Sequence, residues 1–101
     1  MPAPDVVRKL SGLRLALEFY RQERRTPPPS YAAVMESGKL EEVPRLKLKG
    51  HRTSSRVADV KSFLLRDTGG WAYVNAAGPD FGLVYIDCTH FDEKGRPWSE
   101  F

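Results

Sequence analysis

An amphipathic stretch between Asp5 and Arg25 constrains the fold more than any other part of the chain. Its apolar residues recur at steps of four and three positions, which places them on one narrow helical face: Val6, Leu10, Leu13, Leu17 and Tyr20. Asp5 suits the positive end of a helix, and Arg24 and Arg25 suit the negative end. Three prolines at 27–29 cannot continue it. We therefore predict a helix over residues 5–25 that buries one face.

The remaining chain changes character near residue 68. Residues 26–67 are predicted to be a largely irregular connecting region with a short helix at 31–35, and 57–65 could be either a second short helix or a connector. Residues 68–101 alternate apolar and polar side chains between turns, which predicts antiparallel strands at 71–75, 83–91 and 96–101. A helix followed by strands favours an α+β fold, with the long N-terminal helix packed on a small antiparallel sheet.

The totals fit one small domain. With 101 residues, 41% of them apolar, the chain can build a single core of modest size, so we predict one domain over residues 1–101. No apolar run reaches the roughly 18 residues that indicate a membrane span. Cys88 is the only cysteine, which excludes an internal disulfide.

Two sets of polar residues towards the C-terminus could carry chemistry. Cys88 and His90 share a face of a predicted strand, and His51 and Asp87 could join them in a metal or thiol site. Zinc needs three or four such ligands and paired finger spacing is missing, so a small buried Cys88 is favoured and no metal site is predicted. The acidic residues of this region are favoured as turn formers: Asp80, Asp87, Asp92 and Glu93. Neither an enzyme nor a cofactor is predicted.

The first 61 residues are basic, with 13 Lys and Arg against seven Asp and Glu. Several of these basic residues cluster in the middle of the chain. We call the members of this cluster the basic patch: Arg45, Lys47, Lys49, Arg52 and Arg56. Such a patch can bind phosphates. The aromatic residues that usually stack on single-stranded nucleic acid are not interleaved with it. A solvated loop is therefore favoured, and a nucleic-acid-binding module stays an alternative.

The predicted helix carries a second group of apolar residues. Leu15 and Phe19 lie four positions apart and opposite the main stripe, and Val7 lies to one side. A helix that covers one sheet needs only one stripe. Two explanations stay open: the irregular middle folds over these residues, or they form a packing face between molecules. We call Val7, Leu15 and Phe19 the outer apolar set.

Three segments together resemble type IV pilins and the pseudopilins of type II secretion systems. The L-x-x-A-L-x-x-Y pattern in the C-terminal half of the long pilin helix is matched by Leu13, Ala16, Leu17 and Tyr20. Residues 68–74 (TGGWAYV) are similar to the GGW-x-Y segment that begins the pilin sheet, and residues 81–87 (FGLVYID) resemble the strand that follows it. The resemblance covers nearly the whole chain and is weakest over 49–65.

The resemblance implies a structural, non-catalytic subunit of a pilus or pseudopilus fibre. It implies a soluble domain lacking the family's N-terminal membrane segment, which anchors the full-length protein to the inner membrane with this part in the periplasm. The implied partners are copies of itself or related subunits in a helical fibre, and the inner-membrane assembly machinery.

Calcium in a C-terminal loop is also implied for some pseudopilins. Asp80, Asp87 and Asp92 offer carboxylates for it, but they do not match that loop residue by residue, so no site is assigned. A soluble interaction domain with no fibre role stays a third hypothesis.

Overall fold

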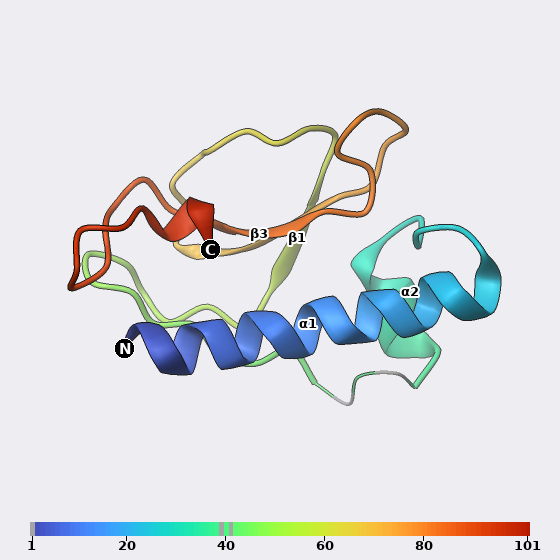
Figure 1. Ribbon diagram of the computed structural model, residues 1–101, viewed down its shortest axis with the longest axis horizontal. Helices are drawn as coiled ribbons and strands as arrows, with labels where there is room; N and C mark the ends of the chain where they lie inside the picture. The colour runs from blue at the N-terminus through green and yellow to red at the C-terminus, as the bar shows by residue number, and fades with distance from the viewer. Residues whose placement is uncertain (1, 39, 41) are drawn as a thin grey trace.

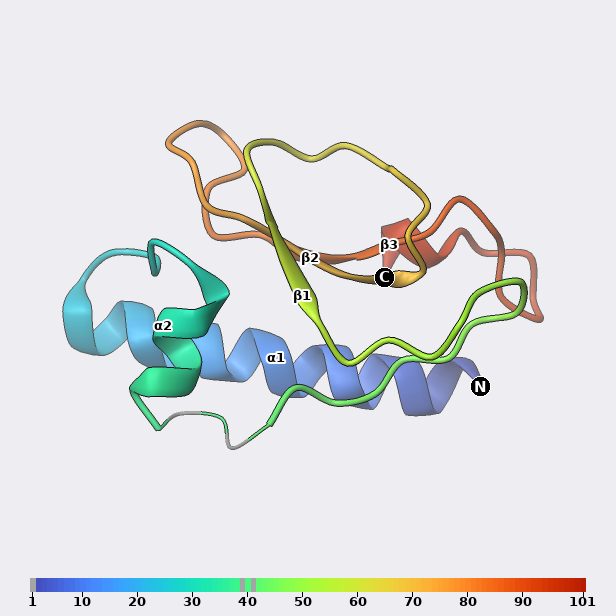
Figure 2. The ribbon, with the colours of Figure 1, turned by 180° about the vertical axis from the view of Figure 1, so that it is seen from behind.

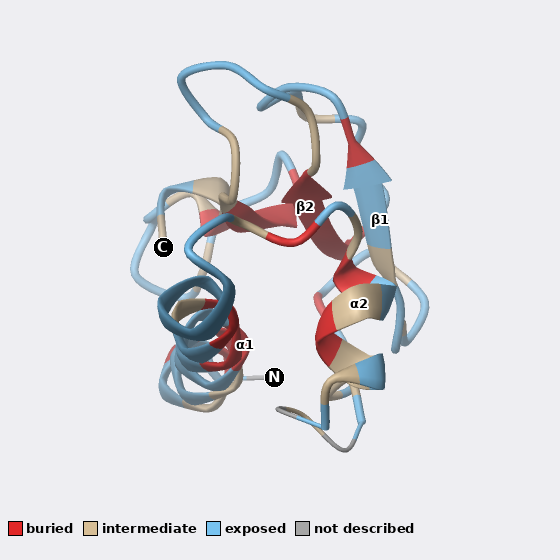
Figure 3. Ribbon diagram, turned by 90° about the vertical axis from the view of Figure 1, so that its right-hand side faces the viewer, coloured by how far each residue is buried: buried red, intermediate tan, exposed pale blue. Residues whose placement is uncertain are grey.

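The computed structural model describes residues 2–38, 40 and 42–101. The chain forms a long helix, a short helix, three short strands and a final 3-10 turn (Figure 1): α1 Ala3–Arg24, α2 Tyr31–Glu36, β1 Val57–Val60, β2 Gly70–Val74, β3 Val84–Asp87 and η1 Trp98–Glu100. The fold is α+β, as predicted, and the buried residues of the two α-helices lie on the sides that face each other below the sheet (Figure 3). None of the helices within the described residues combines the length and the hydropathy that a membrane span needs.

The amphipathic stripe predicts α1 well. All five residues of the stripe are buried, and Ala3 and Ala16 join them in the core. The helix starts at Ala3, two residues before the predicted Asp5. Pro4 is tolerated inside it because it lies in the first turn, where backbone amides lack helical partners in any case. The helix ends at Arg24, and Arg25 takes a left-handed conformation (φ 61°) while its N–H donates to the Arg21 carbonyl.

The three strands form one mixed sheet in the order β1-β2-β3. β2 and β3 are antiparallel, as predicted, with Trp71 opposite Ile86. β1 was not foreseen: it comes from the region where a short helix or a connector was expected, and it pairs in parallel with β2, with Val57 opposite Trp71. The prediction of a wholly antiparallel sheet is therefore wrong. The chain leaves β1 at Val60, crosses the sheet and re-enters at Gly70 in the same direction.

The strand predicted over 96–101 does not form. Phe91 and Pro97 make only an isolated bridge, and the chain then turns into η1. Proline has no N–H to extend a ladder, and the turn lets the Trp98 indole reach the core, where it is 4% exposed.

Apolar side chains cover both faces of the sheet. One face packs on the helices through Trp71, Tyr73, Val84, Ile86 and Cys88. On the other face, Tyr85 lies among Ala72 and Val74. The connection from β1 to β2 passes over this second face (Figure 2), where the Phe63 and Tyr85 rings lie 4.5 Å apart and the Tyr85 hydroxyl donates to the Leu64 carbonyl. This connection therefore takes the place of a second helical layer.

Two tyrosines fix α2 against α1 and the sheet. The Tyr31 hydroxyl donates to the Leu13 carbonyl over 3.1 Å, and its ring meets that of Tyr73 edge-on. Ser30 occupies the expected N-cap position, but its side chain makes no capping bond. The Asp59 carboxylate of β1 instead accepts the Tyr31 amide at 2.9 Å, so the cap comes from a distant segment.

Candidate metal centre

Four side chains from three segments converge at one end of the sheet. They are His51, Asp67, Cys88 and His90, which we call the ligand cluster. Each offers one nitrogen, oxygen or sulfur atom, and these four atoms all lie within 4.8 Å of one another. The cluster joins the loop before β1, the connection from β1 to β2, and the segment after β3.

His51 is carried at the tip of a short loop. Leu46 and Ser54 form an isolated antiparallel bridge with both backbone hydrogen bonds, so residues 47–53 loop back on themselves. The Leu46 and Leu48 side chains are buried and anchor the first half of this loop in the core. The loop is further closed where the Lys47 ammonium donates to the His51 carbonyl.

Asp67 is placed by a buried neighbour. The carboxylate of Asp87, which is 2% exposed, accepts the amides of residues 66 and 67 at 2.7 and 3.0 Å, and the Thr68 hydroxyl at 3.0 Å. This network folds the connection so that Asp67 takes a left-handed conformation (φ 57°). One Asp67 oxygen then accepts the Thr89 amide at 2.9 Å, and this hydrogen bond lowers the pKa of the Asp67 carboxyl.

The ligand atoms form a compact group. His51 Nε2 lies 3.1 Å from Asp67 Oδ1, 3.2 Å from His90 Nδ1 and 3.4 Å from Cys88 Sγ. His90 Nδ1 lies 3.4 Å from Cys88 Sγ and 3.7 Å from Asp67 Oδ1. The His90 amide also donates to Cys88 Sγ over 3.3 Å. The Cys88 thiol is fully buried, whereas the His90 side chain is 50% exposed, so the cluster opens to solvent on the His90 side.

The environment of Cys88 does not suit thiol catalysis. A nucleophilic cysteine needs an exposed thiolate with a lowered pKa. Burial raises the pKa of the Cys88 thiol, and its side chain is inaccessible from solvent. What the four side chains do offer together is a set of metal ligands of the types that zinc prefers.

The sequence predicts part of this cluster. Cys88 is buried, as expected, and His51 and His90 do lie beside it. Asp87 does not join them, because its carboxylate is occupied by the amides of the β1–β2 connection. Asp67 was missed, since its position depends on a turn that Asp87 organises from 20 residues away. The expectation of no metal site stays a prediction.

The remaining predicted residues lie elsewhere. The basic patch is exposed along the extended segment and loop that precede β1. The outer apolar set is also exposed, with Leu15 at 55% and Phe19 at 48%, so the described part of the middle region does not cover these residues. Asp92 accepts the Lys94 and Arg96 amides within its own turn. Among the described residues, Asp80, Asp87 and Asp92 do not gather into a common group of ligands.

Comparison with protein-family models, with curated proteins and with solved structures finds no match for this chain.

Proposed function

We propose that this chain is the globular part of a pilin-like fibre subunit, a structural protein whose long helix packs against its own copies. The observation that carries this proposal is the unequal use of α1. One side of the helix is buried against the sheet, and the opposite side exposes large apolar residues that nothing in the described chain covers.

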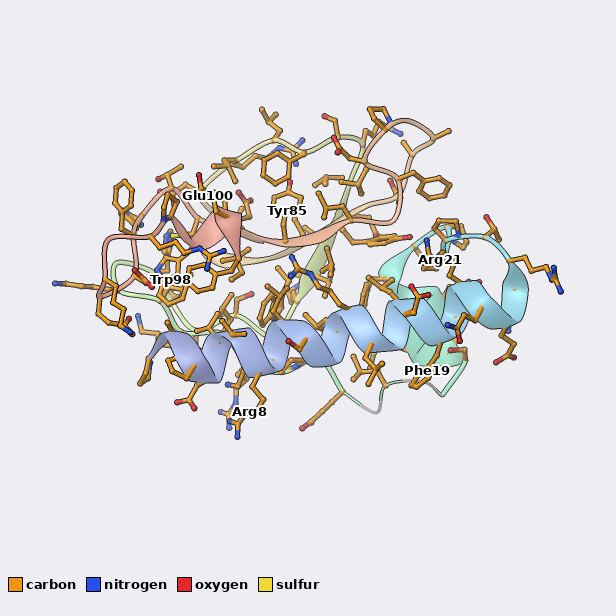
Figure 4. The ribbon with its side chains drawn as sticks, in the orientation of Figure 1. Arg8, Phe19, Arg21, Tyr85, Trp98 and Glu100 are labelled. Carbon is orange, nitrogen blue, oxygen red and sulfur yellow. The ribbon has the colours of Figure 1, made fainter. Side chains whose placement is uncertain are left out.

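The exposed apolar residues lie where a neighbouring subunit could reach them. Phe19 projects from α1 on the side away from the sheet (Figure 4). Leu15 lies one turn earlier, and Val7 is 39% exposed nearer the start of the helix. An exposed apolar side chain favours burial in an interface. Identical subunits that repeat along a fibre would bury this set by packing α1 against α1.

The segments that resemble pilins occupy compatible positions. The four residues of the helix pattern are all buried: Leu13, Ala16, Leu17 and Tyr20. The TGGWAYV segment contains β2, and the FGLVYID segment contains its antiparallel partner β3. α1 and this hairpin form the main apolar layer. A long helix on an antiparallel hairpin is what the resemblance implies, and β1 is an addition to that plan.

A double substitution in the source organism tests the proposal. Leu15→Ser with Phe19→Ser should abolish incorporation into sheared surface fibres, because it removes apolar area from the subunit interface. The free energy of unfolding should change by less than about 0.5 kcal/mol, as for other exposed positions. Leu64→Ser is the matched control, since Leu64 is 54% exposed but belongs to the β1–β2 connection. Normal incorporation of the double variant would contradict the proposal.

The gene offers an independent test. The coding sequence upstream of residue 1 should encode a peptidase cleavage motif followed by an apolar segment of about 20 residues. An upstream reading frame without such a segment would argue for an interaction domain outside any fibre.

A further inference from the structure

We propose that His51, Asp67, Cys88 and His90 bind one zinc ion in a closed tetrahedral site. The site ties together three loops at one end of the sheet. This inference is independent of the proposed role in a fibre, because none of the outer apolar set belongs to the cluster.

Five of the six separations between the ligand atoms are close to those of a tetrahedron around zinc, and the sixth, between the Asp67 oxygen and the Cys88 sulfur, is at most 4.8 Å. Bond lengths of about 2.0–2.1 Å to nitrogen and about 2.3 Å to sulfur place two nitrogen ligands about 3.3 Å apart, and a nitrogen and a sulfur about 3.6 Å apart. The two imidazole nitrogens lie 3.2 Å apart, and each lies 3.4 Å from the sulfur. The Asp67 oxygen lies 3.1 and 3.7 Å from the same two nitrogens.

Hydrogen bonds alone do not account for this geometry. The five contacts just described join atoms that carry at most three hydrogens, one from each imidazole and one from the thiol, since the carboxylate supplies none. An imidazole N–H also points along a single direction, whereas His51 Nε2 has three heteroatom neighbours within 3.4 Å. A cation at the centre would accept a lone pair from all four atoms at once.

The chemistry of the ligands selects the ion. One thiolate, two neutral imidazoles and one carboxylate carry two negative charges, which a divalent cation neutralises. Thiolate and imidazole suit zinc, whereas calcium requires six to eight oxygens. Four protein ligands also fill the tetrahedron, which is typical of structural sites and leaves no open position for a substrate.

One glycine makes room for the cluster. A side chain at Gly69 would place its Cβ 2.2 Å from the His51 ring, and Gly69 has a positive φ of 76°. Gly50 also has a positive φ (88°), but a Cβ there would lie 3.6 Å from the His90 ring, which is an ordinary van der Waals distance. The close backbone approach at Gly69 thus sets where the His51 imidazole lies, and this gives a way to disturb the site without removing a ligand.

Cobalt titration of the full chain, purified without a histidine tag and stripped of metal, tests the site directly. Co²⁺ reports coordination through its visible spectrum. We expect saturation at one equivalent, intense bands of a tetrahedral ion, a thiolate-to-cobalt charge-transfer band, and displacement by Zn²⁺. No saturable binding, or the pale spectrum of a six-coordinate ion without the thiolate band, would overturn the proposal.

Substitutions assign the ligands. His90→Ala and the shape-conserving Asp67→Asn should each weaken Zn²⁺ binding by more than the roughly 10–100-fold that loss of an outer hydrogen-bond partner costs. Asp80→Asn is the control, since Asp80 is an exposed carboxylate outside the cluster, and it should bind Zn²⁺ like the wild type. Equal affinity in Asp67→Asn and Asp80→Asn would remove Asp67 from the site.

Substitutions at two glycines distinguish a displaced His51 ring from backbone strain alone. Gly69→Ala should weaken Zn²⁺ binding at least about tenfold by displacing His51. Gly95→Ala introduces a Cβ at a similar φ of 82°, but no atom lies within 4 Å of it, so its affinity should be unchanged. Circular dichroism establishes that both variants fold. Equal affinities in the two variants would show that the His51 ring does not bind the metal.

Discussion

The helix–sheet layer and the ligand cluster are held together by different kinds of interaction. The layer between α1 and the sheet buries many apolar side chains, whose contribution is additive and largely independent of direction. The cluster brings three loops together through four heteroatoms, and these atoms must keep a defined geometry to bind one ion. The layer should therefore tolerate small shifts, whereas the end of the sheet near His51 should depend on one ion.

This difference matters in a domain of 101 residues. A chain of this size buries only about two thirds of its unfolded surface, and domains somewhat smaller, below about 70–80 residues, often add a metal or a disulfide. The sequence has one cysteine, so no internal disulfide can cross-link these loops. A zinc ion would hold together the three loops at the end of the sheet, which the helix–sheet layer does not cover.

The largest effect is expected in the layer. Leu13→Ala removes a fully buried side chain of α1 and should lower the free energy of unfolding by about 2–5 kcal/mol. Leu13 does not belong to the cluster, so urea titrations with zinc and with a chelator should show the same loss. A loss that appears only with zinc present would mean that the two regions are not separate.

Removal of the metal should have the next largest effect. An ion that binds only the folded chain stabilises it by about 2.7 kcal/mol when its free concentration is 100 times its dissociation constant. A chelator should therefore lower the unfolding free energy of the wild type by about this amount. His90→Ala should show almost no response to the chelator, and an equal response in both proteins would place the metal elsewhere.

A smaller effect is expected for the polar contacts inside the layer. Tyr31→Phe removes the hydroxyl that donates to the Leu13 carbonyl and should cost about 0.5–1.5 kcal/mol at neutral pH. Burial raises the pKa of Tyr31, so the folded state keeps its proton while the unfolded chain loses it above about pH 10. Wild-type stability should therefore fall as the pH rises above 10, and less steeply in Tyr31→Phe. Parallel alkaline profiles would show that Tyr31 does not contribute.

The sequence predicts the layer because its signals are local. The stripe of α1 repeats with the period of a helix, and β2 and β3 are short runs of mainly apolar and aromatic residues that are buried throughout. β1 escaped prediction because it has only four residues, two of them exposed, and its partner is parallel and lies beyond a crossing loop. A strand of this kind is defined by its neighbour more than by its own residues.

The cluster illustrates the limit of spacing arguments. Cys88 and His90 stand two residues apart and could be paired from the sequence, whereas His51 lies 39 residues before His90. Asp67 joins the cluster only because the buried Asp87 carboxylate accepts the amides of residues 66 and 67 and so folds the connection between β1 and β2. A site assembled from three loops has no periodic signal, so its ligands become recognisable only after the chain is folded.

Amide hydrogen exchange with and without zinc tests most directly whether the two regions are held separately. Zinc should slow exchange around the ligand cluster, at residues 48–54, 66–69 and 88–92. In the buried middle of α1, around Leu13, the protection that zinc adds should be much smaller than in these loops. Slowing of equal size throughout the chain, or no change near His51 and Cys88, would show that zinc does not hold these loops separately from the helix–sheet layer.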